Sequence, residues 1–279
     1  MAEVTIRADE LAARLASPNP PVVLDVRWRL GDDRGRDRHR EGHIPGAVYV
    51  DLDTELAGPP DPAAGRHPLP DIASLQAAAR RWGIRDDSTV VAYDDNANQA
   101  AARAWWLLRW AGLDDVLLLD GGLPAWQEAG HDIRAGDEAA SSVGTVTLEP
   151  GHLPTLGIDE VGAFRGTLLD ARAGERYRGE AEPVDPRAGH IPGAISAPTA
   201  ENVDGTGRFL SASDLRARFA TVGVDPATPT AVYCGSGVTA AHQIAALAIA
   251  GIDATLYPGS WSQWSSDPDR PASTGPDPR

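Results

Sequence analysis

The sequence predicts an α/β protein built from two homologous domains, each a mostly parallel sheet with helices on both faces. Three observations predict this fold: a motif that occurs twice, short apolar runs that alternate with helical stretches, and a segment rich in small residues between the halves. The length of 279 residues accommodates two ordinary domains.

The repeat sets the domain organisation. The hexapeptide GHIPGA occupies residues 42–47 and recurs at 189–194. Three more segment pairs keep the same order in both halves: VVLDVR with TLLDAR, VVAYDDN with TAVYCGS, and VLLLDGGLPAW with ATLYPGSWSQW. A long repeat with this order indicates a duplicated domain rather than a solenoid. We expect an N-terminal domain over residues 1–137, a linker over 138–155 and a C-terminal domain over 156–279.

Strands and helices alternate within each half. Apolar runs with the length and β-branching of buried strands occur at Val22–Val26, Val90–Tyr93 and Val116–Leu119. Helical stretches are Asp71–Trp82, Gln99–Ala111, Ser211–Val222 and Val238–Ala250, and each is followed directly by a glycine. This alternation predicts parallel sheets, and ligands of such sheets bind beyond the C-terminal ends of the strands.

Composition excludes several classes of partner. The net charge of −15 disfavours nucleic acid and anionic lipid as partners. We find no apolar run long enough for a membrane helix and no secretory signal. A single cysteine excludes an internal disulfide and a multi-cysteine metal site, and it fits a reducing compartment. We therefore expect a cytoplasmic protein that binds no metal and no cofactor.

That cysteine ends a predicted strand. Cys234 is followed by Gly235, Ser236 and Gly237, and then by a predicted helix. The glycines let backbone N–H groups turn inward as an anion-binding nest, and the helix adds its partly positive N-terminus. These surroundings favour a nucleophilic thiolate, whereas the alternative is a buried, inert cysteine.

Three other interpretations of this loop fail. A dinucleotide site requires an acidic residue at the end of the next strand, and none is present. A P-loop requires Gly-Lys-Ser/Thr, which the sequence lacks at this position. A cysteine phosphatase requires an arginine that closes the loop, but Thr239, Ala240 and Ala241 follow Val238 instead.

The duplicated halves, the GHIPGA pair and the CGSGVTA loop resemble the two-domain rhodanese family of sulfurtransferases, from about Ile6 to Pro271. The resemblance implies a catalytic cysteine in the second domain only, and Asp94 stands at the matching position of the first. A Cys-Gly-Ser-Gly loop is typical of 3-mercaptopyruvate enzymes, whereas basic residues after the cysteine are typical of thiosulfate enzymes. We therefore expect sulfur to pass from 3-mercaptopyruvate to Cys234 as a persulfide, and then to an acceptor.

The resemblance also implies the remaining site residues. Ser236 is coupled in such enzymes to an aspartate and a histidine, which match Asp53 and His67. The donor carboxylate is held by an arginine that matches Arg176. The family's second arginine position holds Asp185 in this sequence, so we expect Arg187 to replace it. The substrate-binding set is completed by Gly235, Gly237, Val238 and Thr239.

The expected partners are a small anionic sulfur donor and a sulfur acceptor. The acceptor is a thioredoxin-like protein, a low-molecular-weight thiol or cyanide. Two other functions stay open: a thiosulfate sulfurtransferase that releases sulfite, and a non-catalytic or persulfide-carrying module.

Overall fold

The computed structural model describes residues 3–278. Residues 1, 2 and 279, which the sequence analysis assigns to the two domains, lie outside this part. The chain divides into two compact units. Unit 1 contains the residues up to Ala57, Pro70–Leu153 and Val203–Phe209, and unit 2 contains Gly58–Leu69, Pro154–Asn202 and the residues from Leu210 onward.

Two short segments therefore pack away from the half of the sequence that contains them. Residues 58–69, here called the strap, belong to unit 2, where the Arg66 N–H donates to Oγ of Ser262 over 3.0 Å. Residues 203–209 belong to unit 1, where the Phe209 N–H donates to a carboxylate oxygen of Asp120 over 2.9 Å. The sequence-based boundaries place both segments in the opposite domain.

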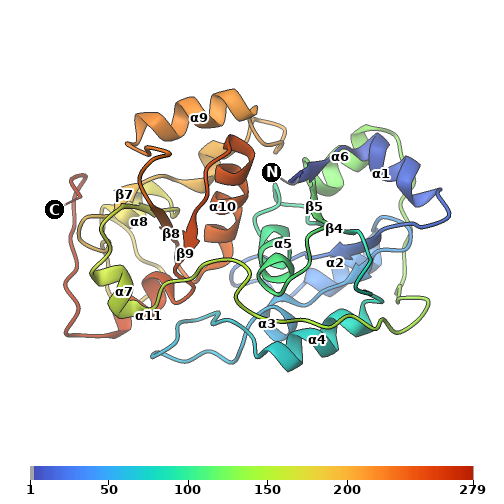
Figure 1. The fold of residues 1–279 in the computed structure, drawn as a ribbon, viewed down its shortest axis with the longest axis horizontal. Helices are drawn as coiled ribbons and strands as arrows, with labels where there is room; N and C mark the ends of the chain where they lie inside the picture. Colours follow the sequence, from blue (N-terminus) through green and yellow to red (C-terminus); the bar gives the residue numbers. More distant parts are fainter. Residues whose placement is uncertain (1–2, 279) are drawn as a thin grey trace. The chain divides into compact units, whose positions relative to one another are not determined.

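Unit 1 is built on a parallel five-stranded sheet with the order β1-β5-β4-β2-β3. Its strands are β1 (Thr5–Ile6), β2 (Val22–Asp25), β3 (Val48–Tyr49), β4 (Val90–Tyr93) and β5 (Val116–Leu119). Its helices are α1 (Ala8–Leu15), α2 (Gly35–Glu41), α3 (Leu52–Glu55), α4 (Ile72–Arg81), α5 (Ala101–Trp110) and α6 (Gly122–Glu128). Helix α5 lies against β4 and β5 (Figure 1).

Unit 2 is built on a parallel four-stranded sheet with the order β7-β6-β8-β9. Its strands are β6 (Thr167–Asp170), β7 (Ile195–Ser196), β8 (Thr230–Tyr233) and β9 (Thr255–Leu256). Its helices are α7 (Ile158–Gly162), α8 (Gly174–Tyr177), the 3₁₀ helix η1 (Thr199–Asn202), α9 (Ala212–Thr221), α10 (Val238–Ala250) and α11 (Ser260–Ser266). Its order repeats β3-β2-β4-β5 of unit 1, as expected for a duplicated domain.

Both faces of each sheet are buried. Successive strand residues point to opposite faces, and the residues on both faces are buried. In unit 1, Val91 and Tyr93 of β4 join a core that includes Leu11 of α1 and Trp126 of α6. In unit 2, the β8 residues Ala231 and Tyr233 pack with side chains of α7 and α11, including Trp261. The alternate strand residues, such as Val90 and Val232, are equally buried. The predicted α/β fold with two similar domains is confirmed.

The repeated hexapeptide has a structural role. In unit 2, the Ile191 N–H donates to the hydroxyl of Tyr233 over 3.1 Å. The guanidinium of Arg172 donates to Asp170 at 2.6 Å and to the Gly189 carbonyl at 2.6 Å. Burial, followed by the charge of Asp170, raises the pKa of Tyr233, which keeps this phenol protonated at neutral pH. GHIPGA is thus joined to the preceding strand by a buried polar network.

Unit 1 contains the same network. Here the Ile44 N–H donates to the hydroxyl of Tyr93 over 3.1 Å, and Arg27 pairs with Asp25 at 3.0 Å. A guanidinium nitrogen of Arg27 also donates to the carbonyl of Gly42. The repeat therefore maintains the fold of each unit and is not itself the site.

The predicted helices are present within two residues at each end, and α10 matches its predicted bounds. Asp71 and Ser211 cap α4 and α9 by accepting backbone N–H groups. The four glycines that follow these helices all have φ between 80° and 97°, which favours glycine at a helix end. Among the described residues, no helix is long and apolar enough to cross a membrane.

The segment expected to be a linker is largely attached to unit 1. Backbone N–H groups of Gly144, Val146 and Glu149 donate to carbonyls of Arg80, Ile84 and Ala111 over 2.7, 3.2 and 3.1 Å. Val146 is fully buried. The change of unit occurs after Leu153.

Candidate active site

The cysteine loop lies at the C-terminal edge of the unit 2 sheet, between β8 and α10. Cys234 is buried, and its Sγ accepts the N–H of Gly237 over 3.1 Å. Gly237 has a φ of 80°, which lets the chain turn directly into α10 at Val238. Within the described chain, the N–H groups of Gly235 and Ser236 have no hydrogen-bond acceptor. The sulfur thus has one backbone donor, from Gly237, and lies at the N-terminus of α10.

Helix α11 fixes this loop. The Trp261 and Ser262 N–H groups each donate over 2.9 Å, to the carbonyls of Cys234 and Gly235. In the other direction, the Cys234 N–H donates to Oγ of Ser260 over 3.2 Å. Ser260 has a φ of 54°, an uncommon conformation for a residue with a side chain. The hydroxyl contact and this backbone geometry together hold the loop against the start of α11.

The strap brings His67 to the loop. Nδ1 of His67 lies 2.7 Å from Oγ of Ser236, and both side chains are buried. Gly65 allows this approach: its φ is 100°, and a Cβ there would lie 2.6 Å from the carbonyl oxygen of Gly259. The Ala63 carbonyl also accepts the side-chain amide of Gln263 over 2.6 Å. The strap therefore packs on α11 at several points and places the imidazole beside Ser236.

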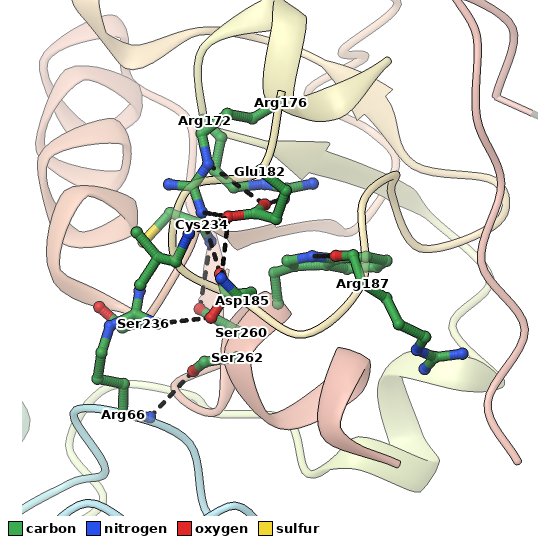
Figure 2. Close-up of polar contacts among 12 residues, drawn as sticks. Arg66, Arg172, Arg176, Glu182, Asp185, Arg187, Cys234, Ser236, Ser260 and Ser262 are labelled. Atoms are coloured by element: carbon green, nitrogen blue, oxygen red, sulfur yellow. Dashed lines mark hydrogen bonds and ion pairs between the residues drawn. The ribbon is translucent and has the colours of Figure 1, made fainter. Parts of the chain in front are cut away.

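Two arginines lie over Gly235. A Cβ at this position would lie 3.2 Å from Nη2 of Arg66 and 3.4 Å from Nη1 of Arg176. Asp185 lies between these arginines, with its carboxylate oxygens 2.5 Å from Arg66 and 3.0 Å from Arg176 (Figure 2). Glu182 pairs with Arg176 at 2.6 Å and also with the buried Arg172 at 3.3 Å. Guanidinium groups next to a thiol form a suitable site for a small anionic substrate.

The geometry and the duplicated fold agree with a comparison of the chain with known families. The model of the rhodanese-like domain matches this chain twice, over residues 7–129 and 158–267. This chain belongs to the rhodanese family. The resemblance expected from the repeat and the CGSGVTA loop is therefore confirmed.

The relatives match nearly the whole length of this chain. It is 49% identical over 278 residues to a protein of Mycobacterium tuberculosis named "Putative thiosulfate sulfurtransferase SseB", with 98% of each chain covered. It is 45% identical over 282 residues to the "Probable 3-mercaptopyruvate sulfurtransferase" of Pseudomonas aeruginosa, covering 97% of this chain and 98% of the relative. The crystal structure of SseA from Escherichia coli, described as a 3-mercaptopyruvate sulfotransferase, has 31% identity and a TM-score of 0.82, with coverages of 93% and 99%. This chain is an enzyme of the sulfurtransferase class.

The position of Arg187 corrects the sequence-based expectation. Its guanidinium points away from Cys234 (Figure 2) and donates to four backbone carbonyls at the end of α11 and just beyond it. The accepting residues are Trp264, Ser265, Asp267 and Arg270, at 2.6 to 2.9 Å. All of its nitrogens are engaged there, so the structure does not bring Arg187 to the cysteine loop. Its role is to cap α11.

The other predicted residues are placed as follows. Arg176, Gly235 and Ser236 lie at the loop, and Val238 and Thr239 form the first turn of α10. Asp53 belongs to unit 1, where both of its carboxylate oxygens accept the indole N–H of Trp28 over 3.0 Å. Its coupling to His67 stays a prediction.

In unit 1, the loop that follows β4 matches the cysteine loop, and its N–H groups bind the side chain of Asp94. Asp94, fully buried, accepts the N–H groups of Asn96, Asn98, Ala100 and Ala101 over 2.7 to 3.0 Å. Burial raises the pKa of this carboxyl, and the four N–H donors oppose that shift. The first rhodanese domain therefore contains a buried carboxyl group where the second contains a thiol.

Sequence reasoning missed three residues of the site: Arg66, Glu182 and Ser260. Arg66 directly precedes the predicted residue His67, so its position in the sequence could have drawn attention to it. Its place at the loop, however, depends on its ion pair with Asp185. Glu182 and Ser260 lie in segments whose approach to the loop is set by the fold. Among the described residues, no cluster of His, Cys, Asp and Glu is arranged to hold a metal ion.

Proposed function

We propose that this sulfurtransferase takes sulfur from 3-mercaptopyruvate, carries it as a persulfide on Cys234 and passes it to a thiol. The observation that carries the proposal is the set of groups around the loop: a buried thiol, a hydroxyl with an adjacent imidazole, and two guanidiniums over Gly235. Each group matches one requirement of the reaction.

The first half-reaction requires a nucleophile and a proton source. The Cys234 thiolate attacks the donor sulfur, the C–S bond breaks, and its electron pair stays on carbon as the enolate of pyruvate. The enolate takes up one proton, which gives pyruvate, and Cys234 retains the transferred sulfur as a persulfide. Ser236 and His67 are the groups that supply this proton, with Asp53 as the proposed orienting carboxylate.

The second half-reaction returns the cysteine to its starting state. A thiolate attacks the outer sulfur, the S–S bond breaks, and the thiolate of Cys234 leaves. The product is an acceptor persulfide, or thiocyanate when the acceptor is cyanide. A thioredoxin-like protein or a low-molecular-weight thiol fits this step, and the single cysteine is the basis for proposing a cytoplasmic location.

Charge near the loop supports 3-mercaptopyruvate over thiosulfate. The guanidiniums of Arg66 and Arg176 are balanced by the carboxylates of Glu182 and Asp185. These four side chains together carry no net charge, and they lie beside the anionic thiolate of Cys234. 3-Mercaptopyruvate brings one negative charge to this site. Thiosulfate is a dianion and brings a second, unbalanced charge into this partly buried site.

Thiosulfate remains the second candidate donor because the relatives at 49% identity are named putative thiosulfate sulfurtransferases. In that reaction the thiolate attacks the outer sulfur and sulfite leaves with the electron pair of the S–S bond. No carbon is protonated, so the hydroxyl of Ser236 has no proton to deliver.

The two donors are distinguished by steady-state rates measured side by side with cyanide as the common acceptor. We expect a higher kcat/KM for 3-mercaptopyruvate. A higher value for thiosulfate would overturn the donor assignment, and the chain would remain a sulfurtransferase with thiosulfate as its donor.

A further inference from the structure

An ion pair between Arg66 and Asp185 joins the strap to the segment that follows Arg176. Nη1 of Arg66 lies 2.5 Å from a carboxylate oxygen of Asp185, whose side chain is 2% exposed. The same carboxylate contacts Arg176 through its second oxygen at 3.0 Å. One buried carboxylate therefore fixes two guanidiniums that come from separate segments of the chain.

Both guanidiniums have N–H groups that make no hydrogen bond within the described chain, and some of these lie next to Gly235 of the cysteine loop. Nε of Arg66 is buried and has no hydrogen-bond partner in the described chain. Nη2 of Arg66 and Nη1 of Arg176 likewise make no hydrogen bond within it, and they are the two atoms nearest to a Cβ placed on Gly235. Of these three donors Nε of Arg66 is buried, and a buried donor without an acceptor is costly, so this arrangement indicates an acceptor that the described chain does not supply.

We infer that Arg66 is a substrate-binding residue which, together with Arg176, holds the carboxylate of the sulfur donor, and that Asp185 positions it. This inference rests on the proposed function, because it assigns the carboxylate of that function's substrate to a specific pair of donors. It adds a substrate residue on the strap that the loop and its spacing do not identify.

The geometry suits a carboxylate. Its two oxygens can each accept from a different guanidinium, with one N–H from Arg66 and one from Arg176. The space for these oxygens is available because residue 235 is a glycine: a Cβ there would lie within 3.4 Å of both donors. Since Gly235 directly follows Cys234, a carboxylate bound at this point places the rest of a small donor next to the sulfur.

Asp185 acts through the arginines. Its own N–H donates to Glu182 over 3.1 Å, so backbone and side chain are both fixed. With Asp185 in place, Arg66 is held in one orientation before the donor binds, which reduces the entropy lost on binding. Without it, the guanidinium remains on the strap but is no longer directed toward Gly235.

The test measures KM and kcat for 3-mercaptopyruvate in the full-length enzyme. Losing a charge-assisted hydrogen bond costs about 1.5–3 kcal/mol, so Arg66→Ala should raise KM roughly 10- to 150-fold with a smaller effect on kcat. Competitive inhibition by pyruvate, which keeps the carboxylate and lacks sulfur, should weaken in parallel. Arg178→Ala, on the same segment as Arg176 but paired at 2.7 Å with exposed Glu180, is the matched control and should change neither constant.

Asp185 is tested by exchanging the pair. Arg66→Asp alone should lose binding of the donor, because two carboxylates then face each other. The double variant Arg66→Asp/Asp185→Arg restores one charge of each sign and should recover a lower KM than the single variant. A double variant no better than Arg66→Asp would overturn the positioning role of Asp185. Thermal unfolding of each variant separates loss of binding from loss of fold.

The failure of this inference differs from a failure of the proposed function. If the wild type forms a persulfide from 3-mercaptopyruvate and Arg66→Ala leaves KM and pyruvate inhibition unchanged, the role of Arg66 is wrong and the proposed function stands. If the wild type forms no persulfide with 3-mercaptopyruvate, the proposed function itself is wrong.

Discussion

The Nδ1 atom of His67 lies 2.7 Å from Oγ of Ser236, although 169 residues separate them in the sequence. The strap makes this contact within unit 2 by packing on α11. A serine hydroxyl next to an imidazole can pass a proton, which sulfur transfer from 3-mercaptopyruvate requires and transfer from thiosulfate does not. This difference between the donors makes the site testable.

The persulfide prediction concerns Cys234. Replacing it with serine should abolish turnover with either donor, because the chain contains no other thiol that could carry sulfur. After incubation with donor, the intact mass of the wild type should increase by one sulfur atom and return to its initial value on addition of cyanide. Substantial turnover by Cys234→Ser would rule out the covalent route.

Ser236→Ala should slow 3-mercaptopyruvate turnover on the order of 10²-fold, because the enolate then lacks its nearby proton source. Thiosulfate turnover serves as the internal control and should change much less. Adding His67→Ala to this variant should have little further effect, since the two groups act as a unit. Equal losses for both donors would contradict the proton-delivery role.

The strap leads to a prediction about truncation. A chain of residues 156–279 retains Cys234 but lacks Arg66 and His67, so it should form persulfide from 3-mercaptopyruvate poorly even where it folds. Persulfide formation, followed by mass, is measured together with circular dichroism to establish folding. Full activity of this fragment would show that the strap is dispensable.

Arg187→Ala should lower stability and leave substrate binding unchanged. The substitution removes four hydrogen bonds from a charged donor to carbonyls around the end of α11, and the loss should be about 2–4 kcal/mol. Urea denaturation measures the loss, and KM at a temperature where the variant is folded provides the control. A large rise in KM with unchanged stability would restore Arg187 to the substrate site.

Asp94→Ala should destabilise unit 1 by about 3 kcal/mol, because four buried N–H groups lose their acceptor. Turnover per folded molecule should be unaffected, since the nucleophile lies in unit 2. Urea denaturation and active-site titration by persulfide formation measure the two quantities.

The cost of Asp94→Ala should also depend on pH. Because burial raises the folded pKa of Asp94 above its unfolded value, the carboxyl contributes most below the ordinary aspartate pKa of about 4. The contribution decreases as the pH rises through the raised folded pKa. The destabilisation should therefore be larger at pH 4 than at pH 7, and the opposite trend would show that the carboxyl is stabilised as an anion.

Local patterns predicted most of the fold. Val90–Tyr93 and Val116–Leu119 are strands with the predicted bounds, because continuous apolar runs between turn residues have few alternatives. The cysteine loop was predictable for the same reason: strand, glycines and helix follow one another directly in the sequence. Short motifs identified Cys234, Ser236 and Arg176, which lie together at this loop, and their roles stay predictions.

Residues whose meaning depends on distant partners could not be assigned in this way. The side chain of Arg66 is held by Asp185, which lies 119 residues away in the sequence. Such long-range contacts pack the strap on unit 2. Arg187 shows the opposite error: it is close to Asp185 in the chain, but its side chain points toward α11. Nearness in sequence does not specify the direction of a side chain.

The exchange of segments between units has a consequence for the order in which a nascent chain acquires structure. Synthesis proceeds from the N-terminus, so the strap is made long before Asp185 and Ser236, its partners in unit 2. Unit 1 in turn lacks Val203–Phe209 until the second half is well advanced. Neither unit can finish folding while the ribosome is still completing the first half. Cys234 therefore meets Arg66 and His67 of the strap only when synthesis of the chain is nearly complete. A partly synthesised chain has no complete active site.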